Sequence, residues 1–194
     1  NLHSIKEACN LLGYETELLS LKKRNYNSDI LILPGIGSFR KAMQIINKNN
    51  IKEKILEHLS DKRKFLIGIC LGMQIFFSRS EEFGSTKGLN FIEGNVKKLN
   101  KKKLIVPHTG WSSINIIQDN YIIQKNSKKN MFYFTHSFFC KPKNKKYVLA
   151  DTKYLSFKFC SVIKKDNIFG MQFHPEKSGS SGLKILENLR KMKV

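Results

Sequence analysis

The sequence lacks the cysteine patterns that build zinc sites and disulfide frameworks. Its 194 residues contain four cysteines, far apart and without a Cys-x-x-Cys pair, at Cys9, Cys70, Cys140 and Cys160. No histidine stands near any of them at the spacing of metal ligands. We therefore expect neither a metal site nor a structural disulfide.

Long apolar runs are missing as well, because charged or polar residues interrupt each one before the roughly 18 to 20 residues that a membrane span needs. We therefore expect no membrane partner. The first residues show neither a basic segment followed by an apolar one nor a small-residue cleavage site, so we expect a cytoplasmic protein. Internal repeats and low-complexity linkers are also absent. A chain of this length, 41% hydrophobic, predicts one domain over residues 1–194.

Acidic residues are few, since 15 Asp and Glu accompany 35 Lys and Arg, and the formal net charge is +20. Such an excess is typical of proteins with nucleic-acid or other anionic partners. The lysines, however, lie in asparagine-rich segments without a recognition motif or aromatic-interleaved basic repeat. This favours solvated loops that attract a phosphorylated substrate or an acidic subunit. A non-catalytic nucleic-acid-binding module remains the alternative from a different functional class.

Helix and strand signals alternate through the first half of the chain. Segments 29–35 and 64–70 contain continuous apolar runs, as in strands buried on both faces of a parallel sheet. Helical patterns lie before, between and after these segments, over about 1–13, 39–47, 51–59 and from Gly72 onward. Gly13 stands where a helix C-cap is expected. Such alternation predicts crossover units and a parallel sheet with helices on both faces.

After residue 88, short aromatic and β-branched runs separated by polar turns predict further strands. These runs cover 89–100, 120–126, 131–140, 146–154 and 159–173. An amphipathic helix is expected at the end, over 182–192. The whole pattern predicts an α/β fold with a central, mostly parallel sheet, flanking helices and added antiparallel strands.

Gly68-Ile69-Cys70-Leu71-Gly72 stands where a predicted strand gives way to a helix. A nucleophile elbow has this spacing, because small residues two positions either side keep strand and helix from clashing. At the start of a helix, the dipole and free amides lower a cysteine pKa and present N–H groups to an oxyanion. A buried core cysteine in a glycine-rich turn is the alternative, and this motif alone leaves it open.

His174 is the best candidate for the base that a cysteine nucleophile needs. A run with strand character ends at His174-Pro175-Glu176, and residues i and i+2 of an extended chain project to the same side. Glu176 would hold one ring nitrogen while the other faces the thiol, as in a catalytic triad. The alternative is a surface His-Pro turn beside an exposed glutamate, which the cysteine motif makes less favourable.

Pro34-Gly35-Ile36-Gly37 links another predicted strand to a helix, and its glycines let backbone amides point at a negatively charged atom. A dinucleotide-binding loop would need a third glycine where Arg40 stands. We therefore exclude a dinucleotide, expect no other cofactor, and favour an oxyanion hole.

Five segments resemble, in order, the class I (triad) glutamine amidotransferases: LPGIGSF, GICLGMQ, VPHTGW, YFTHSFF and FGMQFHPEKS. The resemblance spans essentially the whole chain, and it is greatest to glutaminases that serve imidazole glycerol phosphate synthesis. It implies the fold of that family, and a reaction in which Cys70 attacks the side-chain amide of glutamine. His174 would move the proton and Glu176 would orient it, while ammonia leaves and water hydrolyses the thioester to glutamate.

The resemblance also implies roles for further residues. The oxyanion hole is expected to use Gly35, Ile36 and Leu71, and the glutamine site Gly37, Gln74, His136 and Ser137. The implied partner is a (β/α)-barrel synthase subunit that forms a heterodimer with the glutaminase. It receives the ammonia and makes imidazole glycerol phosphate and AICAR in histidine biosynthesis. Its docking face is expected to include Asn1, His108, Trp111, Tyr133 and Lys177.

The chain departs from the family pattern in three respects. A strand reading roughly Ile-Asp-Tyr-Gly-x-Gly precedes the equivalent of Asn1 in the family, so we expect an N-terminally incomplete domain with unpaired strand groups. Ser112 follows Trp111 where histidine-pathway enzymes usually have asparagine, and the loops are unusually basic. The last two departures leave open a paralogous glutaminase that supplies ammonia for amidation of a nucleotide sugar in surface polysaccharide synthesis.

Overall fold

The computed structural model describes residues 2–19, 26–99, 104–125 and 130–192. The helices are α1 (Leu2–Leu11), α2 (Phe39–Lys48), α3 (Ile51–Ser60), α4 (Leu71–Gln74) and α5 (Gly179–Asn188), with 3-10 turns η1 (Lys145–Tyr147), η2 (Pro175–Lys177) and η3 (Leu189–Lys191). The strands are β1 (Ile30–Gly35), β2 (Phe65–Cys70), β3 (Phe77–Ser80), β4 (Thr86–Lys87), β5 (Ile92–Lys98), β6 (His108–Ser113), β7 (Asn115–Ile116), β8 (Met131–His136), β9 (Phe138–Pro142), β10 (Val148–Tyr154), β11 (Phe157–Lys165) and β12 (Ile168–Met171).

The largest sheet has the strand order β1-β2-β12-β11-β10-β7. The predicted α/β class is confirmed, but parallel pairing within the described residues of this sheet is limited to β1, β2 and β12. Strands β10, β11 and β12 are joined by tight turns in which Leu155 and Asp166 have positive φ. Such short connections allow only antiparallel pairing, so the sheet is mixed rather than mostly parallel.

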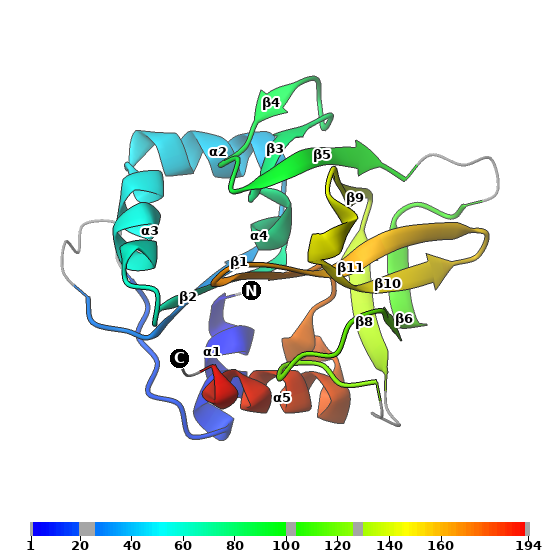
Figure 1. Ribbon diagram of the computed structural model, residues 1–194. Helices are drawn as coiled ribbons and strands as arrows, with labels where there is room; N and C mark the ends of the chain where they lie inside the picture. The colour runs from blue at the N-terminus through cyan, green and yellow to red at the C-terminus, as the bar shows by residue number, and fades with distance from the viewer. Residues whose placement is uncertain (1, 20–25, 100–103, 126–129, 193–194) are drawn as a thin grey trace.

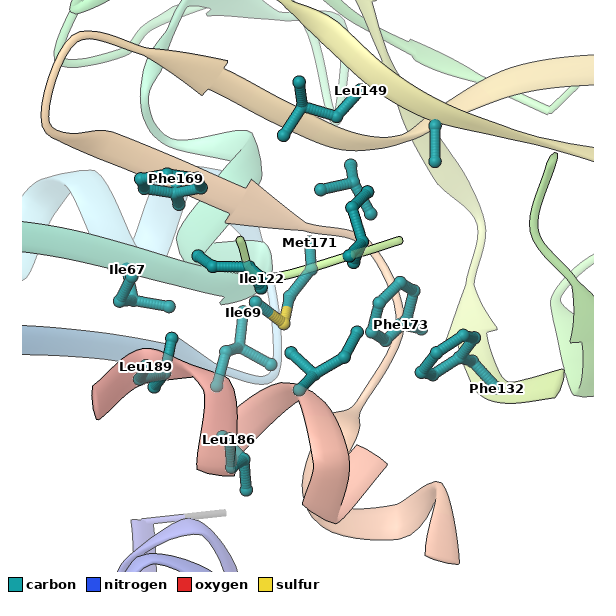
Figure 2. Packing of buried hydrophobic residues seen from close by; sticks show 14 of the residues in the cluster. Ile67, Ile69, Ile122, Phe132, Leu149, Phe169, Met171, Phe173, Leu186 and Leu189 are labelled. Carbon is teal, nitrogen blue, oxygen red and sulfur yellow. The ribbon is translucent and has the colours of Figure 1, made fainter. Parts of the chain in front are cut away.

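Helices cover both faces of this sheet, with α2, α3 and α4 on one side and α1 and α5 on the other (Figure 1). Successive residues of β2 serve the two sides in turn, as strand geometry requires. Ile67 and Ile69 join Leu186 and Leu189 in one core cluster (Figure 2), whereas Leu66 belongs to the cluster under α2 and α3. All six residues of β2 are buried, as its continuous apolar run predicted.

Three local expectations were wrong. The residues of β1 are only half-buried, because β1 is the edge strand among the described residues and pairs with β2 alone. Residues 120–125 form no strand. Ile122 lies buried in a turn, and its carbonyl accepts a hydrogen bond from the Asn188 side-chain amide at 2.9 Å. The last helix begins at Gly179 rather than at residue 182. The helix expected after Cys70 is present as the four-residue α4.

The site is positioned by the ends of the parallel strands. Gly35 of β1 lies directly opposite Cys70 of β2, and Met171 of β12 lies opposite Ile69. Strands β6 and β8 form a separate two-stranded sheet beside this edge, with His108 paired to His136 (Figure 1).

No helix within the described residues is long and apolar enough to cross a membrane.

Candidate active site

Cys70 occupies a sharp turn between β2 and α4, with φ of 54° and ψ of −108°. An L-residue rarely adopts such a conformation, so the turn stores local strain. The flanking glycines make it feasible: a Cβ on Gly72 would collide with the Leu33 carbonyl, and one on Gly68 would press against Phe76. The glycine spacing thus has the steric role predicted for a nucleophile elbow.

Cys70 lines a cavity of about 330 Å³. Eight further residues singled out from the sequence line the same cavity: Gly35, Ile36, Gly37, Leu71, Gln74, His136, Ser137 and His174. Four lining residues were not predicted, namely Glu82, Pro107, Thr135 and Phe138. Segments far apart in the sequence therefore converge on the one cysteine at the end of β2.

His174 and Glu176 form a buried pair, in which His174 Nδ1 lies 2.9 Å from Glu176 Oε1 and each side chain is 2% exposed. The other ring nitrogen, Nε2, makes no conventional hydrogen bond within the described residues and is available to the thiol. Burial acts to lower the pKa of His174, but interaction with the Cys70 thiolate and the Glu176 carboxylate outweighs it and raises the pKa to about 9. The arrangement favours the protonated, imidazolium form of His174.

The pairing of His174 with Glu176 does not arise from an extended strand, as the sequence suggested. β12 ends at Met171, and Glu176 lies in the 3-10 turn η2, with Pro175 at its first position. The turn is fixed to β8, since the His174 backbone N–H donates to the Tyr133 carbonyl at 2.9 Å. Ser178 reinforces this link by donating to the His174 carbonyl at 2.6 Å.

Two further segments line the cavity beside Cys70. The end of β1 continues through Gly35 and Ile36 to Gly37, which has a φ of 99° that favours glycine. Leu71, the first residue of α4, lies on the other side of the cysteine. Gly35 packs so closely against Leu71 that an added Cβ would lie 3.0 Å from the Leu71 Cβ. The structure therefore brings the residues predicted for the oxyanion hole together around Cys70.

Gln172 is a site residue that the sequence reasoning missed. It is fully buried, and its Nε2 lies 3.6 Å from Cys70 Sγ. Its Oε1 accepts from Gln74 Nε2 at 3.2 Å, and the same Gln74 amide donates to the Phe138 carbonyl at 2.9 Å. The signal was present in principle, because Gln172 stands two residues before His174 near a strand end.

Glu82 was missed too, and it is the one carboxylate among the described residues that line this cavity. Its Oε2 accepts the backbone N–H of Phe39, the first residue of α2, at 2.6 Å. A carboxylate at a helix N-terminus is stabilised by the helix dipole. The position of Glu82 depends on a contact between segments 43 residues apart, which no local pattern reveals.

The residues predicted for the docking face divide into two groups. Trp111 is 52% exposed and packs edge-on against Tyr133, and the Lys177 ammonium lies 5.9 Å from the Tyr133 ring centre. These three form a surface group on β6, β8 and η2. His108, by contrast, is 1% exposed, so its side chain is not available for docking. Asn1 lies outside the described residues.

His136 lines the cavity but is not arranged as the base. Its Nδ1 donates to the Phe138 carbonyl at 2.8 Å. This nitrogen therefore has a backbone partner, whereas His174 Nδ1 has a carboxylate partner, as a catalytic base requires. Burial lowers the pKa of His136 to about 3, with His108 and His174 acting in the same direction. It is therefore neutral near physiological pH, and its role in the substrate pocket stays a prediction.

Residues 1–192 match the family model described as glutamine amidotransferase class-I. The chain is 39% identical to imidazole glycerol phosphate synthase subunit HisH of Chlorobaculum tepidum, over 97% of this chain and 93% of that protein. It is 42% identical to the protein of the same name from Methanocaldococcus jannaschii, over 97% of this chain and 92% of that protein.

Solved structures show the same fold at low sequence identity. A glutamine amidotransferase crystal structure matches with a TM-score of 0.71 at 16% identity, over 97% of this chain and 93% of the other. A glutamine amidotransferase from Thermotoga maritima matches with a TM-score of 0.61 at 14% identity, over 96% and 76%. Given the full-length family match and relatives near 40% identity, the chain belongs to the class I glutamine amidotransferase family.

Proposed function

We propose that the chain is a glutaminase that hydrolyses L-glutamine to glutamate and ammonia through a thioester on Cys70. One observation carries the proposal: the strained Cys70 and His174 line a single cavity near the ends of three parallel strands, and the buried Glu176 holds the His174 ring. A nucleophile, a base and a group that orients the base constitute the minimum machinery for acyl transfer.

The reaction follows from these positions. The Cys70 thiolate attacks the side-chain amide carbon, an S–C bond forms, and the carbonyl oxygen becomes an oxyanion facing the Gly35-Ile36 and Leu71 amides. His174 gives its proton to the departing nitrogen, the C–N bond breaks, and ammonia leaves. Water, deprotonated by His174, then attacks the thioester, so that glutamate and the Cys70 thiolate are released.

Other cavity residues hold the amino-acid end of the substrate. Glu82 supplies a fixed negative charge, which pairs with the α-ammonium group of glutamine. The backbone at His136-Ser137 and the Gln74 side chain border the remaining space, where the Gln74 Oε1 atom remains available as an acceptor for the substrate. A free amino acid, with one positive and one negative terminus, fits this arrangement better than a peptide does.

The ammonia is passed to a synthase subunit. Relatives at about 40% identity over nearly their whole length carry the name of a subunit of imidazole glycerol phosphate synthase, which supports a place in histidine biosynthesis. We propose a (β/α)-barrel synthase as the partner, bound as a heterodimer. The exposed Trp111, Tyr133 and Lys177 group is its docking face, and it lies on the strands next to the cavity.

Substitution of the nucleophile tests this function in the assembled enzyme. Cys70→Ala should abolish glutamine-dependent synthesis while synthesis from added ammonium continues, because the synthase subunit does not need the thiol. Cys160→Ala is the matched control, since this buried cysteine lies outside the cavity. Persistent glutamine-dependent synthesis in Cys70→Ala would overturn the proposal.

A further inference from the structure

A line of hydrogen bonds leads from strand β6 to the cavity. Ser112 Oγ lies 2.9 Å from His108 Nε2, and His108 Nδ1 lies 3.1 Å from His136 Nε2. His136 Nδ1 in turn lies 2.8 Å from the Phe138 carbonyl oxygen. We call these four groups and the two glutamine amides described below the β6 hydrogen-bond chain.

The Phe138 carbonyl determines which atom donates and which accepts in each hydrogen bond between it and Ser112. A carbonyl oxygen only accepts, so His136 Nδ1 carries the proton and His136 Nε2 of the neutral ring is an acceptor. His108 Nδ1 must then donate, its Nε2 must accept, and the Ser112 hydroxyl must donate to it. Burial keeps both rings neutral, because it lowers the pKa of His108 to about 4 and that of His136 to about 3.

The inner end of the chain reaches the nucleophile. The Phe138 carbonyl that binds His136 also accepts from Gln74 Nε2 at 2.9 Å. The Gln74 amide reaches Gln172 Oε1, and this contact fixes which end of the Gln172 amide faces Cys70. The Gln172 N–H group then lies toward Cys70 Sγ, at a nitrogen–sulfur distance of 3.6 Å.

His108 is held in one orientation by its surroundings. It lies directly opposite His136 in the register of β6 and β8. Its ring is stacked between Tyr154, with centroids 3.9 Å apart, and Phe134, with centroids 4.9 Å apart. A ring packed in this way cannot rotate freely, so His108 keeps its Nδ1 directed at His136 Nε2.

We propose that His108 is a positioning residue for glutamine hydrolysis, acting on Cys70 through the β6 hydrogen-bond chain. The proposal rests on the proposed function, in which Cys70 is the nucleophile. An N–H group directed at sulfur stabilises the negative charge on sulfur, so the orientation of the Gln172 amide, 3.6 Å from Cys70 Sγ, affects the reactivity of the nucleophile. Ser112 forms the outer end of the chain on β6.

The bond directions can be tested without any enzyme activity. Heteronuclear NMR of the imidazole nitrogens in the intact chain should show His108 and His136 neutral near physiological pH, each with its proton on Nδ1. The His108→Asn variant assigns the His108 signals. A proton on Nε2 of either ring, or a charged ring at this pH, would overturn the proposal.

The effect on the nucleophile is tested by two substitutions of the same residue. His108→Phe keeps the aromatic stacking and removes both hydrogen bonds, whereas His108→Asn retains a donor near the position of Nδ1. The measurement is the pH dependence of Cys70 alkylation by iodoacetamide, with the modified site identified by mass spectrometry. Ser113→Ala, an exposed position on the same strand, is the matched control.

We expect His108→Phe to shift the alkylation profile to higher pH and to lower kcat for glutamine about tenfold in the assembled enzyme, since a buried acceptor loses its donor. His108→Asn should recover most of both effects, and Ser113→Ala should match the parent. An unchanged profile in His108→Phe, or equal losses in Phe and Asn variants, would overturn the proposal. A parent enzyme that alkylates as expected but hydrolyses no glutamine would instead refute the proposed function.

Discussion

The ionisation of His174 depends on two neighbouring side chains, Cys70 and Glu176. Its pKa is raised to about 9, with burial opposing the shift and the Cys70 thiolate and Glu176 carboxylate causing it. At neutral pH the ring therefore carries the proton that the departing ammonia needs. This protonation is lost as the pH rises through the raised pKa, which predicts an alkaline limb in the dependence of activity on pH.

Glu176→Gln tests this electrostatic role. The neutral amide can still contact the ring but no longer favours its charged form, so the pKa of His174 falls towards its ordinary value of 6.5. We expect the alkaline limb of kcat to move to lower pH, and kcat at the optimum to fall by less than in Cys70→Ala. Rate measurements from neutral to strongly alkaline pH check this. A limb at the parent position would contradict the assigned role.

Individual catalytic residues could be predicted from the sequence where the chemistry requires particular neighbours in the chain. The glycines around Cys70 and the His174-Pro175-Glu176 segment identified the cysteine and its base, because elbow and triad require particular neighbours in the chain. Gln172 and the buried position of His108 were missed. Their roles arise from contacts between β2, β6, β8 and β12, which short-range spacing does not encode.

Among the elements, the turn between β2 and α4 has the least steric freedom. We expect Gly72→Ala to destabilise the protein by about 1–3 kcal/mol, because the new methyl group meets the Leu33 carbonyl of β1 and forces α4 away. Glutamine hydrolysis should fall with it, since α4 carries Leu71. Thermal unfolding and glutamate release measure the two effects. Unchanged stability would show that the close packing of α4 on β1 is wrong.

Strand β1 has an open edge among the described residues. Among the described residues β1 pairs only with β2, so its other edge presents unpaired backbone groups. We propose that a further strand pairs there. Adding about ten residues of the family's first strand before Asn1 should raise the melting temperature, because the strand satisfies these backbone groups. A scrambled extension is the control, and equal melting temperatures would contradict the proposal.

The elements themselves were predictable where one periodicity dominates. The helical spacing of α2 and α3 and the apolar run of β2 were read correctly from the sequence. The burial of β1 was not, since an edge strand and a central strand can have the same apolar run. Residues 120–125 failed for a related reason: two buried isoleucines suggest a strand, but here they fill a turn over α5.

At the scale of the whole molecule, the buried neutral histidines couple stability to pH. The folded-state pKa values of His108 and His136 are lowered to about 4 and about 3 from 6.5, so the unfolded chain binds more protons between these limits. The stability contributed by these two neutral rings is therefore full above 6.5 and is lost as the pH falls from 6.5 towards 3. Melting temperatures across this range should decline in the parent and decline less steeply in His108→Asn. Equal slopes would contradict the linkage.

We propose that Cys70 is the nucleophile of a glutaminase coupled to a synthase. The most direct measurement treats the assembled enzyme with a glutamine analogue that carries an electrophilic carbon in place of the amide, and maps the covalent adduct by mass spectrometry. We expect one adduct, on Cys70, formed in parallel with the loss of glutamate release and prevented by excess glutamine. Complete inactivation with the adduct on another residue, or with Cys70 unmodified, would contradict it.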